Sequence, residues 1–175
     1  MEGPSLKLAE AQLQPFKKMV VKRASGNTKL GAEQFTGKEV LDIFSWGKHL
    51  VFQFDTVAVR IHFMLFGTYE AEVEGASVTG EYKRARVPRL SFVFDNGRID
   101  MFNCSVKILE TKHAKKDYDF SIDILSPKWD ETKVRNLAKA QPDEEIADIL
   151  LDQEIFAGVG NIIKNEVLSL VKLNP

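Results

Sequence analysis

The spacing of apolar residues changes twice along the chain, and each change predicts a change of secondary structure. Apolar residues recur at helical spacing near the start, at Leu6, Ala9, Leu13 and Phe16. With Ser5 as its N-cap, this segment is expected to form a helix that ends near Lys18. The period then becomes two up to about residue 125, and it returns to the helical period afterwards. The pattern therefore predicts a β-rich lobe followed by a helical lobe.

The β-rich region contains several candidate strands that are rich in β-branched and aromatic residues. The clearest are residues 40–44, 50–54, 57–61, 90–94 and 99–102. Asp95-Asn96-Gly97 lies between the last two, and Asn-Gly tolerates the positive φ angles of a type I′ turn, which predicts a hairpin. Ser45-Trp46-Gly47 predicts a second tight connection, with Lys48 at or near its tip.

Ser126-Pro127 ends the strand pattern, and the remaining residues alternate between helical segments and breaks. Helices are expected over residues 131–139, from Pro142 through Leu150, and over 162–172. Gly158-Val159-Gly160-Asn161 interrupts the last two. We therefore expect two domains, residues 1–125 and 126–175, with a cleft between unlike surfaces, which is a common site for ligands.

Composition narrows the classes of protein that this chain can represent. Its 175 residues suffice for one substantial core, and no stretch of eighteen apolar residues predicts a membrane span. Cys104 is the only cysteine, so an intrachain disulfide is excluded, and one cysteine with three histidines cannot supply a recognisable zinc site. We expect no metal or cofactor in the chain, and a location in the cytoplasm or nucleus. A net charge of −1 argues weakly against a nucleic-acid partner, which usually requires a basic surface.

The first residues, Met1-Glu2-Gly3-Pro4, combine an amine with a carboxylate. An α-amine has a pKa of about 7.7–8.0, against about 10.4 for lysine, so roughly a tenth of it is free base at pH 7. It could attack an aldehyde-like carbon and form a Schiff base, with Glu2 as proton donor or acceptor. The alternative is that these residues have no catalytic role, which is the more common case for chains that begin with Met, an acidic residue and Gly-Pro.

Three further motifs each allow a functional and an ordinary interpretation. Lys48 either holds a phosphate or is a solvated turn lysine. The apolar run from His62 to Gly67 is either buried core or an exposed wedge that fills the gap left when a base leaves the DNA stack. Amides after Gly158-Val159-Gly160 can receive a phosphate oxygen at a helix start, with Asn161 beside them, although many helical hairpins contain such glycines.

Taken together and in this order, these motifs resemble the formamidopyrimidine-DNA glycosylase/endonuclease VIII family. The resemblance is carried by Glu2-Gly3-Pro4, Gly47-Lys48, residues 61–67 and, most specifically, residues 152–161. It covers essentially the whole chain and corresponds to the first two-thirds of the family's length. It implies an α+β fold in which an N-terminal helix packs on a two-layer antiparallel β-sandwich. A helical domain with a partial helix–two-turn–helix motif then follows.

The resemblance also implies a base-excision repair DNA glycosylase/AP lyase, a hydrolase and lyase that acts on double-stranded DNA with oxidised or abasic lesions. In the family the terminal amine attacks C1′ and the neighbouring glutamate assists sugar-ring opening; Met1 and Glu2 match these positions. The Schiff base then undergoes β- and δ-elimination, which nicks the strand. The expected DNA-binding residues are Lys48, His62, Met64, Leu65, Phe66 and Asn161, and Lys48 also belongs to the catalytic set.

Met64, Leu65 and Phe66 match the residues that fill the space of the flipped base. They follow the endonuclease VIII arrangement, in which all three lie on one loop, and this favours oxidised pyrimidines over 8-oxoguanine as substrates. The partner is therefore expected to be damaged duplex DNA, bound by a monomer and without a membrane.

The chain departs from the family pattern in ways that bear on its activity. The family begins Met-Pro-Glu-Gly-Pro, with the proline as nucleophile, whereas Met1 here directly precedes Glu2 and is expected to be retained. A family lysine is replaced by Ala147 or Asp148, and we expect the C-terminal finger of the family, which often carries zinc, to be absent. We expect reduced or lost activity and weak, salt-sensitive DNA binding. The alternatives are a non-catalytic damaged-DNA-binding module or degenerate paralogue, and a fragment with an exposed apolar face.

Overall fold

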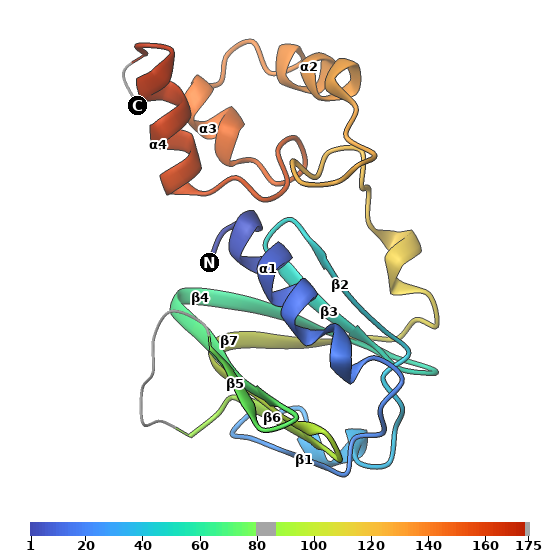
Figure 1. Ribbon diagram of the computed structural model, residues 1–175. Helices are drawn as coiled ribbons and strands as arrows, with labels where there is room; N and C mark the ends of the chain where they lie inside the picture. Colours follow the sequence, from blue (N-terminus) through green and yellow to red (C-terminus); the bar gives the residue numbers. More distant parts are fainter. Residues whose placement is uncertain (80–86, 174–175) are drawn as a thin grey trace.

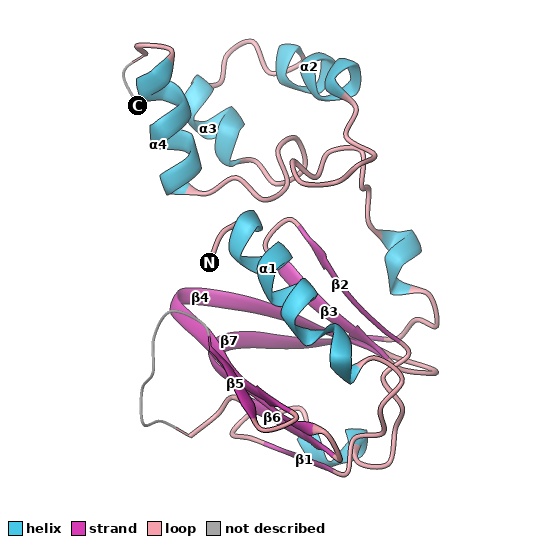
Figure 2. Ribbon diagram, in the orientation of Figure 1, coloured by secondary structure: helices cyan, strands magenta, loops and turns pink. Residues whose placement is uncertain are grey.

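The computed structural model describes residues 1–79 and 87–173, which form a β-rich lobe and a smaller helical lobe (Figure 1). The β-rich lobe contains α1 (Gly3–Leu13), β1 (Arg23–Ser25), β2 (Asp42–Trp46), β3 (His49–Gln53), β4 (Ala58–Val73), β5 (Ala76–Thr79), β6 (Leu90–Phe94) and β7 (Gly97–Leu109). Short 3-10 turns cover Gln14–Phe16, Ala32–Phe35 and Ala114–Asp117. The helical lobe contains α2 (Glu131–Lys139), α3 (Ile146–Leu151) and α4 (Asn161–Leu170) (Figure 2).

The strands form one antiparallel sheet, in the order β1-β6-β7-β4-β3-β2 with β5 on β4, and this sheet is folded into two layers. The fold occurs where the register between the long strands β4 and β7 shifts, between Phe63 and Thr68. Phe52 of β3 and Phe92 of β6 are not sheet neighbours, yet their rings lie edge to face at 5.7 Å across the core. The predicted two-layer antiparallel β-sandwich with an N-terminal helix is therefore confirmed.

Helix α1 buries the predicted apolar stripe, and Leu6, Ala9 and Leu13 are fully buried against the sandwich. The expected N-cap at Ser5 is wrong, because Glu2 is the cap and the helix begins at Gly3. Pro4 lies in the first turn, where its missing N–H has no intrahelical partner to lose. The α-helix ends at Leu13 and passes directly into the 3-10 turn Gln14–Phe16, where Pro15 has no N–H to continue the α-helical hydrogen bonds.

The hairpin between β6 and β7 is confirmed, but its predicted type I′ turn is wrong. Asp95 and Asn96 form the two-residue loop between the partners Phe94 and Gly97, and neither loop residue has a positive φ. Gly97 takes φ 148° instead, and a side chain there would overlap the carbonyl oxygen of Glu72 on β4. The glycine is therefore required by the close approach of the next strand.

The helical lobe agrees with the pattern at α2 and departs from it at α3. Helix α2 has the expected bounds, and the Asp130 carboxylate accepts a hydrogen bond from the Lys133 amide (3.0 Å) as its N-cap. Helix α3 begins at Ile146 and not at Pro142. Residues 143–145 are all acidic and exposed, so a helical turn there would bury no apolar side chain that stabilises it. Within the described residues, no helix has the length and apolar character needed to cross a membrane.

Candidate functional site

The N-terminus of α1 lies directly against the loop that precedes α4 (Figure 1). The Gly3 amide donates to the Gly158 carbonyl oxygen at 2.9 Å. The two carboxylate oxygens of Glu2 accept hydrogen bonds from the amides of Ile162 (2.8 Å) and Ile163 (3.2 Å). Glu2 therefore caps a helix that begins about 160 residues later, and its negative charge lies at the positive end of that helix.

Three glycines allow the backbones of the two lobes to meet at this point. A side chain at Gly160 would overlap the Glu2 carboxylate. A Cβ added to Gly3 would lie 3.1 Å from Gly158, and one added to Gly47 would lie 3.1 Å from the Gly158 nitrogen. Glycine is therefore favoured at these positions because the backbone segments of the two lobes approach each other so closely.

Lys48 lies at the tip of the β2–β3 hairpin, in the two-residue loop with Gly47, as the sequence predicts. The Gly47 amide donates to Oδ2 of the buried Asp123 at 3.1 Å, which fastens the hairpin to the chain leading into the helical lobe. Burial lowers the pKa of Lys48, and the nearby charge of Glu2 opposes this effect. The ammonium and the carboxylate therefore share one electrostatic environment.

His62 lies near Lys48 and the terminal amine. Burial lowers its pKa; the positive charges of Lys48, the Met1 amine and Arg60 act in the same direction, and the Lys48 backbone raises it. The ring of His49 is 5.6 Å from that of His62, and burial with the charges of Arg60 and His62 lowers the pKa of His49 to about 4. Both imidazoles are therefore neutral at neutral pH.

The apolar run after His62 is divided between the core and the surface. Phe63 is buried, whereas Met64, Leu65 and Phe66 are 49%, 78% and 58% exposed. The interpretation as buried core is therefore wrong for these three residues, which are exposed as the wedge interpretation requires. Strand β4 is also much longer than the predicted strand over residues 57–61, because it continues beyond the bend to Val73.

The bend that exposes these residues has a defined backbone. Phe66 has φ 62° and Asn103 on the facing strand has φ 47°, both in the left-handed region. The Asn103 side-chain amide donates to the Leu65 carbonyl oxygen at 2.6 Å, which holds the exposed segment to β7. A Cβ at Gly67 would lie 2.6 Å from the Asn103 carbonyl oxygen, so the crossing requires glycine.

Asn161 is exposed at the first turn of α4, next to Gly160 and the Glu2 carboxylate. The structure thus gathers Met1, Glu2, Lys48, His62 and the start of α4 in one place. Sequence reasoning missed the contribution of Asp123, which has no motif around it. Among the described residues, no group of three or more histidines, cysteines or carboxylates is placed to hold a metal ion.

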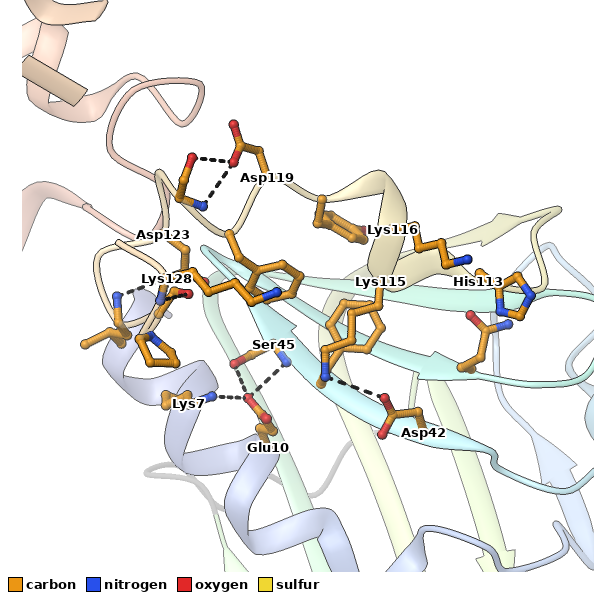
Figure 3. A pocket seen from close by; sticks show the side chains of 18 of the residues that line it. Lys7, Glu10, Asp42, Ser45, His113, Lys115, Lys116, Asp119, Asp123 and Lys128 are labelled. Carbon is orange, nitrogen blue, oxygen red and sulfur yellow. Dashed lines mark hydrogen bonds and ion pairs between the residues drawn. The ribbon is translucent and has the colours of Figure 1, made fainter. Parts of the chain in front are cut away.

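A pocket of about 1020 Å³ lies elsewhere, between α1, the edge strand β2 and residues 112–128 (Figure 3). Its carboxylates are engaged within the protein: Glu10 accepts from the Ser45 amide (3.1 Å) and contacts Lys7, and Asp42 contacts Lys115 (3.7 Å). The Ser45 amide lies on the open edge of β2, and its hydrogen bond to Glu10 prevents this edge from pairing with another strand at that point.

Comparisons with known proteins were made by sequence and by structure. No protein-family profile matches the chain. Endonuclease 8-like 3 of Mus musculus is 31% identical over 143 residues, which is 81% of this chain and 23% of that protein. The DNA-(apurinic or apyrimidinic site) lyase Nei2 of Mycolicibacterium smegmatis is 29% identical over 136 residues, which is 75% of this chain and 50% of that protein. The matched part of the chain therefore spans 23% of the length of the first relative and 50% of the length of the second.

Two solved structures share the fold over the whole chain. The crystal structure of a viral DNA glycosylase has a TM-score of 0.83 at 18% identity, and the match covers 100% of this chain and 72% of that one. The complex of Lactococcus lactis Fpg with DNA containing an abasic site has a TM-score of 0.76 at 21% identity and covers 100% and 68%. The arrangement of the sandwich and the helical lobe is thus common to all three.

Proposed function

This chain belongs to the formamidopyrimidine-DNA glycosylase/endonuclease VIII family, and we propose that it carries the reactive site of a base-excision DNA glycosylase/AP lyase. One observation carries the proposal: the terminal amine, Glu2, Lys48 and His62 lie together beside the start of α4. An amine, a carboxylate and an ammonium group at one point are the groups that Schiff-base chemistry on a sugar requires.

In the proposed reaction the free-base form of the Met1 amine attacks C1′ of the damaged nucleotide. A bond forms between nitrogen and C1′ while the bond from C1′ to the base breaks, and the base leaves with a proton. Glu2 exchanges a proton with the sugar ring oxygen as the ring opens to the Schiff base. Elimination then transfers a C2′ proton to water, forms a double bond between C2′ and C3′, and breaks the C3′–O bond to the 3′ phosphate, whose charge Lys48 is placed to balance.

The proposed partner is duplex DNA that contains an oxidised or abasic nucleotide. Lys48, His62 and Asn161 would contact the phosphates beside the lesion, since they supply a cation and neutral donors around the reactive amine. Met64, Leu65 and Phe66 would enter the space that the flipped nucleotide leaves. Because all three lie on one exposed segment, we propose oxidised pyrimidines as the preferred bases.

Activity is expected to depend on the residue that provides the amine. Borohydride trapping on DNA with an abasic site should give little cross-link with Met1 at the terminus, because its long side chain must fit beside Glu2 and His62. A variant with proline inserted before Glu2, and the initiator Met removed, should trap about tenfold more. Efficient trapping by the unaltered chain would contradict this expectation.

Glu2 has a second candidate role, because both of its carboxylate oxygens already cap α4. This observation favours the alternative of a binding module in which Glu2 is purely structural. Glu2→Gln in the proline-inserted background separates the two functions. In an enzyme the substitution abolishes nicking while binding of abasic DNA persists; in a binding module there is no nicking to lose in either variant.

A further inference from the structure

The outer face of the sandwich carries a row of polar residues where β4 and β7 pair. Arg60 lies opposite Lys107, and His62 lies opposite Ser105. Cross-strand partners share a face of the sheet, as do residues two apart on one strand, so all four side chains belong to the same face. We call these four residues the β4–β7 row.

The burial of neighbouring residues shows which way this row faces. Val59, Ile61 and Phe63 alternate with the row along β4, and all three are buried in the core of the sandwich. The row therefore lies on the opposite face, where Lys107 and Ser105 are exposed and Arg60 and His62 are half-buried.

The row is bounded on one side by the chain that leads to the helical lobe. Tyr118 and Phe120 pack on Phe44 of β2, with ring centroids 5.7 and 6.2 Å apart, and Ala114 packs on Val51 and Ala58. These contacts cover the β2–β3 part of the face. The uncovered part begins at Lys107 and at the half-buried Arg60, whose side chain lies beside Tyr118, and it leads along β4 through His62 to the exposed segment at Met64.

Among the residues that the structure describes, the two cations of the row have no acidic partner. Within residues 1–79 and 87–173, neither Arg60 nor Lys107 forms an ion pair with a carboxylate. The outward residues nearest to them on these strands, His62 and Ser105, are also not acidic. The protein has a net charge of −1, yet this face carries two positive charges that no neighbouring carboxylate balances. The face is therefore expected to attract an anion.

We propose that Arg60 and Lys107 form a second phosphate contact, one nucleotide further along the strand than the contact at Lys48 and His62. This inference rests on the proposed function and specifies how the DNA lies. Residues two apart on a strand are separated by roughly 6.8 Å, comparable to the distance between successive phosphates of a DNA strand. The guanidinium of Arg60 supplies the paired donors that suit a phosphate. The DNA backbone then follows the β4–β7 row and stops where Tyr118 covers the sheet.

A purely structural role for Lys107 is the competing explanation. Residues 103–109 of β7 pair with β4 alone among the described strands, so they form an edge, and lysines on edge strands prevent pairing between molecules. Such a role predicts association of the protein when Lys107 is replaced, and it predicts nothing about DNA.

The test measures the affinity for a duplex with a tetrahydrofuran abasic analogue between 50 and 200 mM salt. Arg60→Gln with Lys107→Gln should lower the slope of log affinity against log salt by about 1.8, because each lost phosphate contact contributes roughly 0.9. Affinity at the lowest salt should fall about tenfold or more. Arg60→Lys should retain the slope, since it retains the charge.

The matched control is Arg23→Gln with Lys29→Gln, which removes the same two charges from exposed positions at and after β1. Equal slopes in the test and control pairs overturn the inference, as does association of the Lys107→Gln protein without a change in slope. A folded wild-type chain that does not bind the duplex at all overturns the proposed function as well, which distinguishes the two failures.

Discussion

At the scale of single residues, the position of Glu2 links the chemistry of the site to the stability of the fold. Its carboxylate accepts from two amides at the start of α4, and Gly160 leaves room for it. The same carboxylate influences Lys48. A substitution at any of these residues is therefore expected to affect both the packing of the helical lobe and the environment of the reactive amine.

Gly160→Ala should displace Glu2 from α4, because the added Cβ would occupy the space of the carboxylate. Loss of these charge-assisted hydrogen bonds should lower the free energy of unfolding by about 1–3 kcal/mol, measured by urea denaturation. In a Glu2→Ala background the same substitution should cost almost nothing. Additive effects of the two substitutions would show that the contact does not form.

His49 should make stability depend on pH between about 4 and 6.5. Burial and the charges of Arg60 and His62 lower its folded-state pKa to about 4, so the folded protein prefers the neutral ring. The stabilisation is complete above the unfolded pKa of about 6.5 and is lost as pH falls towards 4, by up to ~3 kcal/mol. Urea titrations at several pH values would measure it. His49→Gln should reduce this dependence and leave the part that comes from His62, whose pKa is also lowered by burial, whereas His113→Gln, at an exposed position, should leave it unchanged.

At the scale of elements, the bend in β4 separates the core residues that stabilise the fold from the exposed residues that face the proposed DNA partner. Before the bend, Val59 and Ile61 are buried in the core. At the bend, the register with β7 shifts and three apolar side chains turn outward. An exposed apolar segment of this kind is costly in water unless a partner covers it.

Leu65→Ser should weaken binding to an abasic duplex by about tenfold and leave the free energy of unfolding within about 0.5 kcal/mol, because Leu65 is 78% exposed. Anisotropy titrations with abasic and undamaged duplexes would measure the first effect. Leu170→Ser on α4, where the side chain is 80% exposed, is the control and should change neither quantity. Equal losses for both duplexes would exclude a role in filling the space of the missing base.

At the scale of the whole molecule, the two lobes are joined by hydrogen bonds and by a shared apolar cluster, in which Trp46 of β2 packs with Val134 and Ile149 of the helical lobe. The Ala157 amide donates to the Ile122 carbonyl oxygen (3.0 Å), and the Ile124 amide donates to the Ala157 carbonyl oxygen (3.1 Å). Gly47 and Gly3 add the contacts to Asp123 and Gly158. The site therefore depends on the packing of both lobes. The division into domains at residue 125 stays a prediction, since β7 ends at Leu109 and α2 begins at Glu131.

The local pattern of the sequence determined much of this architecture. The buried stripe of α1, the bounds of α2 and the hairpin that presents Lys48 follow from periodicity and turn residues, because burial of one face imposes a period on the chain. The order of motifs around Glu2, Lys48, His62 and Asn161 was sufficient to suggest the family.

Other features were decided only by tertiary structure. The capping of α4 by Glu2 joins residues about 160 positions apart, and no local pattern records a contact of that length. Exposure of Met64–Phe66 depends on where the folded sheet bends, and the positive φ of Gly97 depends on the neighbouring Glu72. Hydrophobic periodicity reports which residues prefer burial, whereas the packing of distant segments determines which of them obtain it.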